Sequence, residues 1–260
     1  MTGSRQRVLS KRRTRMLARL GSARGRVREG FVLVEGVRAA AEALASGVVV
    51  RFVVCSRALT RSSAGEELLA ELEARGLTPD WVGEREMAAL SATSSPQGIL
   101  LVCEEPSTTL ATAAATEARL LALDGIQDPG NLGTLVRTAR AFDLTGVIAL
   151  DGTVDPWNAR AVRASAGSVF RISVVRAPWT EVSARAAGAQ VIVADAAGRD
   201  AASLSVKPPW MLVVGNEGGG VRAEIREAAN AWAAVPMAGA ADSLNAAVAG
   251  AIVLYALTRR

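Results

Sequence analysis

The chain has 260 residues, 50% of them hydrophobic, which is enough for one or two domains with substantial cores. It has no histidine and only two cysteines, which excludes Ser-His-Asp and Cys-His triads, histidine zinc sites and four-thiolate metal sites. The formal net charge of +5 is uneven, because residues 1–30 hold ten basic side chains and one acidic side chain.

The sequence gives no sign of membrane insertion or export. No apolar run approaches the roughly 20 residues that a membrane-spanning helix needs. The first ten residues lack the apolar core of a secretory signal, and two unpaired cysteines suit a reducing compartment. We therefore expect a cytoplasmic protein with neither a membrane segment nor a bound metal.

Residues 1–30 form a basic N-terminal arm or helix. Val8, Met16, Leu17 and Leu20 interleave with the charges at near-helical spacing, which favours a helix docked on the protein over a free tail. Arginine richness can follow from genomic base composition, so the clustering of the charges is the stronger signal. It predicts contact with RNA phosphates through Lys11, Arg12, Arg13, Arg15, Arg19, Arg24, Arg26 and Arg28.

Residues 31–105 alternate short apolar runs with amphipathic segments, which predicts a small α/β domain. The expected strands are 31–36, 48–55 and 98–103, and the expected helices are 37–46 and 66–75. Residues 106–117 lose this periodicity and are interpreted as a linker.

Residues 118–260 show a stronger alternation of strands and helices. Strands are expected at 120–124, 146–150, 170–175, 191–194, 211–215 and 233–236. This pattern favours a mainly parallel sheet with helices on both faces, in which ligands bind beside the carboxyl ends of the strands. The loops that follow strands are therefore the most informative segments.

The first such loop, residues 128–137, enters a helix that is expected to run to about Phe142. Asn131 lies at the helix entrance, where an N-cap is the ordinary explanation. Arg137 falls off the apolar stripe of this helix, and Gly133 leaves open space one turn before it. Arg137 can thus face a ligand, although a solvated surface charge is the simpler alternative.

The second loop, residues 215–220, is rich in glycine and carries Glu217, a carboxylate with little packing reason to be there. A plain strand-to-helix connection, with Glu217 compensating a helix N-terminus, is the alternative. The third loop, residues 235–245, leads into an apolar helix from Ala246 to Leu257. Ser243 is a natural N-cap, and the Asn245 amide needs a polar partner.

Together the three loops resemble the SpoU/TrmH branch of the SPOUT RNA methyltransferases, and the likeness covers nearly the whole chain. Residues 131–137 are similar to the first family motif, 215–218 to the second, and 235–239 with 243–245 to the third. Residues 163–167 resemble a further family stretch. Residues 28–36 and 97–98 are similar to the N-terminal substrate-binding domain of the family.

The resemblance implies a small N-terminal α/β substrate-binding domain at 31–105 and a C-terminal α/β-knot domain at 118–260, with a trefoil knot around a mainly parallel sheet. It also implies a homodimer through the C-terminal domain and S-adenosylmethionine as cofactor. The implied cofactor-binding residues are Gly215, Asn216, Glu217, Val235, Met237, Leu244 and Asn245. The implied catalytic residues are Arg137, Asn131, Glu217, Ser243 and Asn245.

The implied reaction is methyl transfer to a ribose 2′-hydroxyl of RNA. Arginine is effectively always protonated, so we expect Arg137 to orient the hydroxyl or phosphate and to stabilise the developing alkoxide, while another group takes the proton. The added N-terminal domain favours 23S ribosomal RNA. The alternatives are a transfer RNA methyltransferase and a non-catalytic RNA-binding or ribosome-assembly factor with a vestigial site. A third alternative is a Rossmann-type methyltransferase. That class has a glycine-rich cofactor loop after its first strand, and residues 124–130 fit such a loop poorly.

Overall fold

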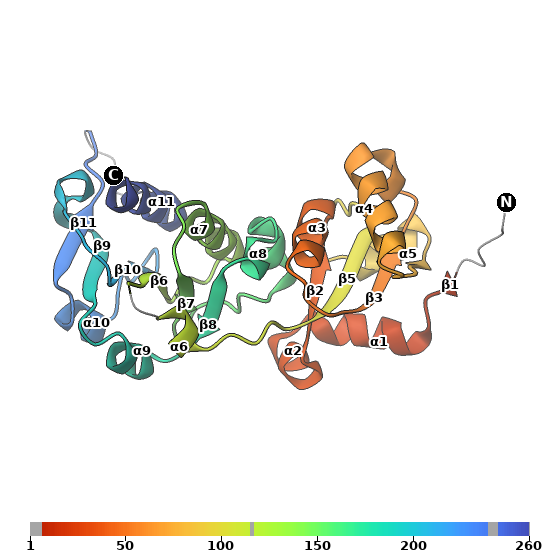
Figure 1. Cartoon of the computed structure of the whole chain (residues 1–260), viewed down its shortest axis with the longest axis horizontal. Helices are drawn as coiled ribbons and strands as arrows, with labels where there is room; N and C mark the ends of the chain where they lie inside the picture. Colours follow the sequence, from red (N-terminus) through yellow and green to blue (C-terminus); the bar gives the residue numbers. More distant parts are fainter. Residues whose placement is uncertain (1–6, 115–116, 239–243, 260) are drawn as a thin grey trace. The chain divides into compact units, whose positions relative to one another are not determined.

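The computed structural model describes residues 7–114, 117–238 and 244–259, and their contacts divide into two compact units (Figure 1). The first unit holds the described residues up to Pro106 together with Trp157–Phe170. The second unit holds the described residues of 107–156 and 171–260. The chain therefore passes between the two units three times.

The first unit is built on a mixed five-stranded sheet in the order β1-β4-β3-β5-β2. Strand β5 runs antiparallel to both β2 and β3, and β4 runs parallel to β1 and β3. The strands are β1 (Arg7–Val8), β2 (Phe31–Glu35), β3 (Val50–Cys55), β4 (Asp80–Trp81) and β5 (Ile99–Glu104). The helices are α1 (Lys11–Leu20), α2 (Ala23–Glu29), α3 (Val37–Ala45), α4 (Ser63–Ala74), α5 (Glu84–Leu90) and α8 (Ala159–Ala164), with single 3-10 turns η1 (Leu59–Arg61) and η2 (Ser168–Phe170).

Helix α1 confirms the prediction of a docked N-terminal helix. Ser10 caps it by accepting a hydrogen bond from the Arg13 amide, and Leu17 and Leu20 are buried in the core between α1 and the sheet. From Lys11 to Glu29 the basic segment forms two packed helices, α1 and α2, which lie on the opposite side of the sheet from α3 and α4 (Figure 1).

Both cysteines are buried free thiols in the first unit. Burial raises the pKa of Cys55 and of Cys103 to about 12, because the surrounding apolar side chains disfavour a thiolate. These thiols are therefore packing residues and are poor nucleophiles.

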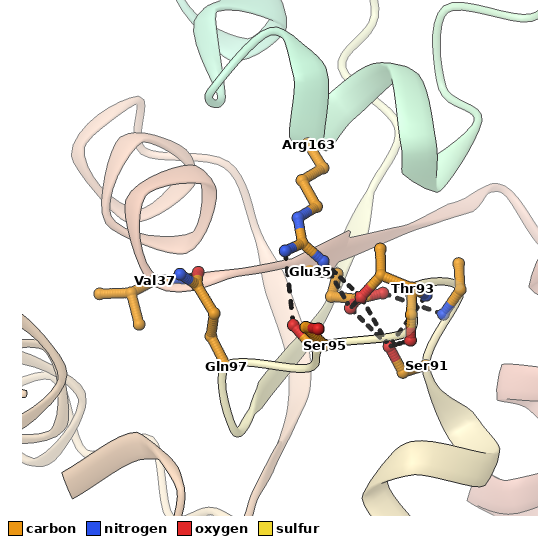
Figure 2. Close-up of polar contacts among 8 residues, drawn as sticks. Glu35, Val37, Ser91, Thr93, Ser95, Gln97 and Arg163 are labelled. Carbon is orange, nitrogen blue, oxygen red and sulfur yellow. Dashed lines mark hydrogen bonds and ion pairs between the residues drawn. The ribbon is translucent and has the colours of Figure 1, made fainter. Parts of the chain in front are cut away.

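Helix α8 is held in the first unit by a buried carboxylate, that of Glu35 at the end of β2 (Figure 2). Glu35 accepts hydrogen bonds from the hydroxyls of Ser91 and Thr93, from the Ala92 amide at 2.9 Å, and from Arg163 Nη1 at 3.2 Å. Because an unpaired buried carboxylate is costly, this network gives α8 a strong preference for its place in the first unit.

The turn after α8 also fits the first unit closely. Gly167 has φ +81, and a Cβ there would lie 2.6 Å from the Glu42 Cβ of α3. The sequence boundaries assign residues 157–170 to the range 118–260, whereas the contacts group them with the first unit. The physical reason is a pairing of distant residues, Glu35 with Arg163, that no local pattern encodes.

The second unit contains a six-stranded sheet in the order β11-β9-β10-β6-β7-β8, and all of its strand pairs are parallel. This agrees with the predicted mainly parallel α/β architecture. The strands are β6 (Arg119–Asp124), β7 (Gly146–Ala149), β8 (Ser173–Arg176), β9 (Gln190–Asp200), β10 (Trp210–Gly215) and β11 (Ala231–Ala234). The helices are α6 (Leu110–Ala113), α7 (Pro129–Ala141), α9 (Trp179–Arg185), α10 (Ala223–Glu227) and α11 (Ala246–Thr258), with a 3-10 turn η3 (Ala201–Ser203).

The segment interpreted as a linker, residues 106–117, contains the short helix α6, which Thr109 caps. Two strand bounds predicted for this part of the chain were wrong. Phe170 ends the 3-10 turn η2, so the expected strand 170–175 begins only at Ser173. Strand β9 continues to Asp200, well beyond the expected end at Ala194, because its later residues pair with β11.

Helices α7 and α11 pack side by side next to β10 (Figure 1). The contact is close because Gly250 of α11 has no side chain, and a Cβ there would lie 2.7 Å from Leu135 Cδ2 and 3.1 Å from Val214 Cγ2. This packing brings the N-termini of the two helices to the carboxyl edge of the sheet. None of the helices in the described ranges is long and apolar enough to span a membrane.

A candidate active site at the carboxyl edge of the parallel sheet

The loops that follow β6 and β10 meet at one edge of the six-stranded sheet. These strands are parallel neighbours and end in register, with Gly215 opposite Asp124. Asp124 is buried and accepts two hydrogen bonds from Arg222, one from its amide at 2.8 Å and one from Nε at 2.7 Å. This ion pair fixes the far end of the β10 loop over the end of β6.

Asn131 lies in the first turn of α7 and is not its cap. Asp128 is the cap, since its Oδ1 accepts a hydrogen bond from the Asn131 amide at 2.8 Å. The ordinary N-cap explanation for Asn131 is therefore wrong, and its side chain is available for other contacts. Its Nδ2 donates to Glu217 Oε1, and its Oδ1 accepts from Asn245 Nδ2 at 3.0 Å.

Asn245 caps helix α11. Its Oδ1 accepts hydrogen bonds from the amides of Ala247 at 2.9 Å and Val248 at 3.2 Å, while its Nδ2 donates to Asn131. The polar partner that the sequence required for this amide is thus found. Ser243, the cap expected from the sequence, lies outside the described residues, and the structure assigns the cap to Asn245.

The glycine-rich loop after β10 is organised by Asn216. Its Oδ1 accepts from the amides of Gly218 and Gly219, and its Nδ2 donates to the Gly125 carbonyl at 2.8 Å. The backbones of Asn216 and Gly220 also exchange two hydrogen bonds. The loop therefore folds back on itself and presents Glu217 to Asn131.

A pocket of about 320 Å³ lies beside these loops. Six of the seven predicted cofactor-binding residues line it: Gly215, Asn216, Glu217, Val235, Met237 and Leu244. The seventh, Asn245, is outside its wall, and its two chain neighbours Leu244 and Ala246 are part of that wall. The pocket also has wall residues that the sequence interpretation missed, Ala194, Asp195 and Ala196 on β9 and Ala249 and Val253 on α11.

Arg137 stands apart from the pocket wall. It is an exposed residue of α7, and its side chain makes no hydrogen bond or ion pair with the described residues. Within one chain the structure thus brings Asn131, Glu217 and Asn245 together and leaves the Arg137 guanidinium free on the helix surface.

The predicted RNA-contacting residues of α1 and α2 separate into three groups. Arg13 pairs with Asp80 at 2.5 Å, Arg19 with Glu29 at 2.6 Å, and Arg28 more loosely with Glu29 at 3.8 Å. Arg26 is buried and donates to the Leu20 carbonyl, so it acts in packing and has no access to RNA. Lys11, Arg12, Arg15 and Arg24 are exposed and have no polar partner among the described residues.

The C-terminal half of the sequence matches a known family. Residues 118–255 match the SpoU rRNA Methylase family. The chain belongs to the SpoU rRNA methylase family. It is therefore an S-adenosylmethionine-dependent RNA methyltransferase. Residues 11–101 match the MRM3-like substrate binding domain.

Two curated relatives cover nearly the whole of this SpoU methylase. The 23S rRNA (guanosine(2553)-2′-O)-methyltransferase RlmP of Bacillus subtilis (strain 168) is 36% identical over 242 residues, 92% of this chain and 93% of the relative. A 23S rRNA (uridine(2479)-2′-O)-methyltransferase of Streptomyces viridochromogenes is 32% identical over 256 residues, 94% of this chain and 88% of the relative.

Solved structures of rRNA methyltransferases are similar to this chain over nearly its whole length. The AdoMet-bound rRNA methyltransferase from Sinorhizobium meliloti is 32% identical, has a TM-score of 0.81 and is matched over 96% of this chain and 95% of its own. The SpoU methyltransferase AviRb from Streptomyces viridochromogenes, in complex with AdoMet, is 30% identical with a TM-score of 0.77, over 94% and 96% of the two chains.

The lining of this pocket fits S-adenosylmethionine. Val214, Val253 and Leu244 are apolar wall residues, and Gly215 and Gly220 leave backbone accessible. Asp195 and Glu217 add two carboxylates to the wall, which attract positively charged groups such as sulfonium and ammonium. Asp195 is held in place by Arg226 at 3.0 Å and by the Ala197 amide at 2.9 Å. Among the described residues, no cluster of His, Cys, Asp and Glu side chains could hold a metal ion.

Proposed function

We propose that this SpoU methylase transfers the methyl group of S-adenosylmethionine to a ribose 2′-hydroxyl of 23S ribosomal RNA. The observation that carries the proposal is the chain of hydrogen bonds from Asn245 through Asn131 to Glu217, which joins the three motif loops at the rim of one pocket. The two curated relatives named above act on 23S rRNA at ribose 2′-oxygens, which supports this substrate over transfer RNA.

The cofactor-binding residues in this proposal are Gly215, Asn216, Glu217, Val235, Met237, Leu244 and Asn245. S-adenosylmethionine supplies an activated methyl group when it is bound. The Glu217 carboxylate is an exposed acceptor beside the pocket, which suits a place near positive charge. Asn216 contributes by holding the loop in shape, because all of its side-chain polar atoms are used within the loop and toward Gly125.

The catalytic residues in this proposal are Arg137, Asn131, Glu217, Ser243 and Asn245. Loss of the 2′-hydroxyl proton develops negative charge on the attacking ribose oxygen, which is neutralised as the methyl group is transferred, so a fixed cation beside that oxygen stabilises the developing alkoxide. Arg137 is the cation proposed for this role, since its guanidinium has no partner among the described residues that would neutralise it. Asn131 and Asn245 hold the loops at the rim of the pocket in position. Glu217, a phosphate or a water molecule accepts the proton of the ribose 2′-hydroxyl.

We further propose that the protein is a homodimer that associates through α11. Val248, Ile252 and Tyr255 are 47%, 41% and 54% exposed and lie at spacings of four and three residues, which forms one apolar stripe on this helix. Tyr255 contacts Phe142 at the end of α7, the helix that carries Arg137. A second subunit on this stripe would lie close to Arg137 and would complete the site. A trefoil knot in residues 118–260 is part of the same proposal.

The first unit is proposed to recognise RNA, with residues 31–105 as substrate-binding domain, 1–30 as its basic extension and 106–117 as the connection to the methylase domain. The exposed Lys11, Arg12, Arg15 and Arg24, together with Arg28, supply charge for phosphate contacts. Because ribosomal RNA is the proposed substrate, we expect the protein to act in the cytoplasm.

The test is methylation of purified RNA by the purified protein with isotope-labelled S-adenosylmethionine. We expect label in 23S rRNA transcripts and none in transfer RNA, and mapping of 2′-O-methyl groups should give one nucleotide. Calorimetry should detect S-adenosylmethionine binding by the same preparation. Label in transfer RNA alone would replace the proposed substrate, and absence of cofactor binding would favour a non-catalytic RNA-binding protein.

A further inference from the structure

A second cavity, of about 330 Å³, lies in the first unit, between the start of α1 and strands β2, β3 and β4 of the sheet. We call it the Phe31–Phe52 pocket, and it is lined by Ser10, Arg12, Arg13, Met16, Phe31, Arg51, Phe52 and Asp80. Three arginines and one acid line its wall, so the cavity carries an excess of positive charge. All of its residues belong to the first unit, whereas the three motif loops belong to the second unit.

Two of the four phenylalanines of the chain lie in this pocket, and each is covered by an arginine. The Arg13 guanidinium lies 4.8 Å from the ring centre of Phe52, and that of Arg51 lies 5.2 Å from the ring centre of Phe31. The Arg13 contact has a structural explanation, because Arg13 is held in place by its ion pair with the buried Asp80. Arg51 is different, because its side chain is 54% exposed and its pairing with Glu104 is loose, at 3.9 Å.

Strand β3 is distorted where Arg51 lies. Adjacent residues of a strand normally point to opposite faces of the sheet. The register between β3 and β5 shifts between Val50 and Phe52, which marks a bulge, and both Arg51 and Phe52 line the same pocket. Bulges often re-aim a side chain near a functional site, and here the distortion places a guanidinium plane over Phe31.

The start of α1 provides a further cationic wall. The first turn of this helix carries Lys11, Arg12 and Arg13 and no acidic residue. Positive side chains are unfavourable at a helix N-terminus, where the helix dipole already concentrates positive charge. Arg12 has no polar partner among the described residues, so this end of the pocket is suited to an anion.

We propose that the Phe31–Phe52 pocket binds one unpaired nucleotide of the RNA substrate, away from the ribose that is methylated. The base of this nucleotide stacks on the guanidinium of Arg51, on the face that is turned away from Phe31. The phosphate of the nucleotide binds Arg12 at the start of α1. Stacking on arginine planes is how proteins hold splayed single-stranded bases, whereas a phosphate ion alone would need no such plane. The inference rests on the proposed RNA substrate and deepens it.

The test is fluorescence anisotropy with two labelled single strands of about 12 nucleotides, one of oligoadenylate and one abasic, both read over a range of salt concentrations. Arg51→Lys keeps the charge and removes the plane. We expect it to weaken oligoadenylate binding about tenfold and to leave abasic binding unchanged. Arg12→Gln should weaken both strands and reduce the slope of log K against log salt by about 0.7.

Arg75→Gln is the matched control, because Arg75 is a partly exposed arginine of the same unit and the C-cap residue of α4, a helix on the other side of the sheet. It should bind both strands within about twofold of the unmodified protein. Undiminished oligoadenylate binding by Arg51→Lys, or an equal loss with Arg75→Gln, would overturn the inference, as would failure of the unmodified protein to bind oligoadenylate. Calorimetry with S-adenosylmethionine tests the proposed function separately, since this pocket contributes nothing to the cofactor site.

Discussion

Asn131 illustrates how one side chain can connect three distant parts of a sequence. Its amide group donates to Glu217 and accepts from Asn245, so its orientation is fixed at both ends. Asp128 supplies the helix cap that Asn131 would otherwise provide. The side-chain amide therefore links the loops at the rim of the pocket and contributes little to the stability of α7.

Asn131→Asp should separate these two roles. It removes the donor to Glu217 and places a second carboxylate beside it, so we expect methyl transfer to fall by at least about tenfold. The free energy of unfolding should change by less than about 1 kcal/mol, because Asp128 still caps the helix. Asp128→Asn is the control, since asparagine caps as well as aspartate, and it should methylate normally. Full activity of Asn131→Asp would show that Asn131 has no role in methyl transfer.

The proposed catalytic role of Arg137 depends on the second subunit of the proposed dimer. Arg137→Ala should lower the methyl-transfer rate by at least about 100-fold, which is typical of removing one fixed group that stabilises transition-state charge. Its dissociation constant for S-adenosylmethionine should stay unchanged, since Arg137 is not part of the pocket wall.

The matched control for Arg137 is Arg185→Ala on α9, an exposed arginine with no polar partner among the described residues. It should keep the rate of the unmodified protein. Arg137→Lys retains a charge and should retain part of the activity across pH. Turnover of Arg137→Ala close to that of the unmodified protein would remove Arg137 from the mechanism.

At the scale of elements, α8 shows that proximity in sequence does not decide which sheet a helix joins. It lies between β7 and β8 in the chain and yet packs in the first unit, where Arg163 meets the buried Glu35 (Figure 2). Residues 163–167 are conspicuous as a family motif, and the structure gives them a role in stabilising the first unit.

Arg163→Ala should destabilise the protein by about 1–3 kcal/mol, because it leaves the Glu35 carboxylate buried without its cation. Chemical denaturation would measure the loss. Arg160→Ala on the same helix is the control, since Arg160 is exposed and its side chain has no polar partner in the described part of the chain. In the Glu35→Gln background, Arg163→Ala should cost less. Equal costs in both backgrounds would show that the two side chains are not coupled.

At the scale of the whole molecule, the exposed stripe on α11 is the feature that a single chain leaves unexplained. Ile252→Glu, at the centre of the stripe, should convert the proposed dimer to a monomer and lower methyl transfer, because a carboxylate is costly to bury in an apolar interface. Size-exclusion chromatography with light scattering would measure the mass, and circular dichroism would report the fold.

Val27→Glu is the control for this experiment, because Val27 is 69% exposed on α2 of the first unit. It should leave the mass unchanged. A monomeric unmodified protein with full activity would contradict the dimer and, with it, the proposed route by which Arg137 reaches the site.

The sequence by itself determined the alternation of strands and helices and the docked N-terminal helix, which follow from local periodicity. The resemblance of its motifs to the SpoU/TrmH family implied seven cofactor-binding residues, and six of them line one pocket. Only the tertiary structure decided that Asn245 caps α11, that Asp195 completes the pocket wall, and that α8 belongs with Glu35. Each of these depends on a contact between residues far apart in the chain, and burial and hydrogen-bond satisfaction select such contacts only when the whole fold is in place.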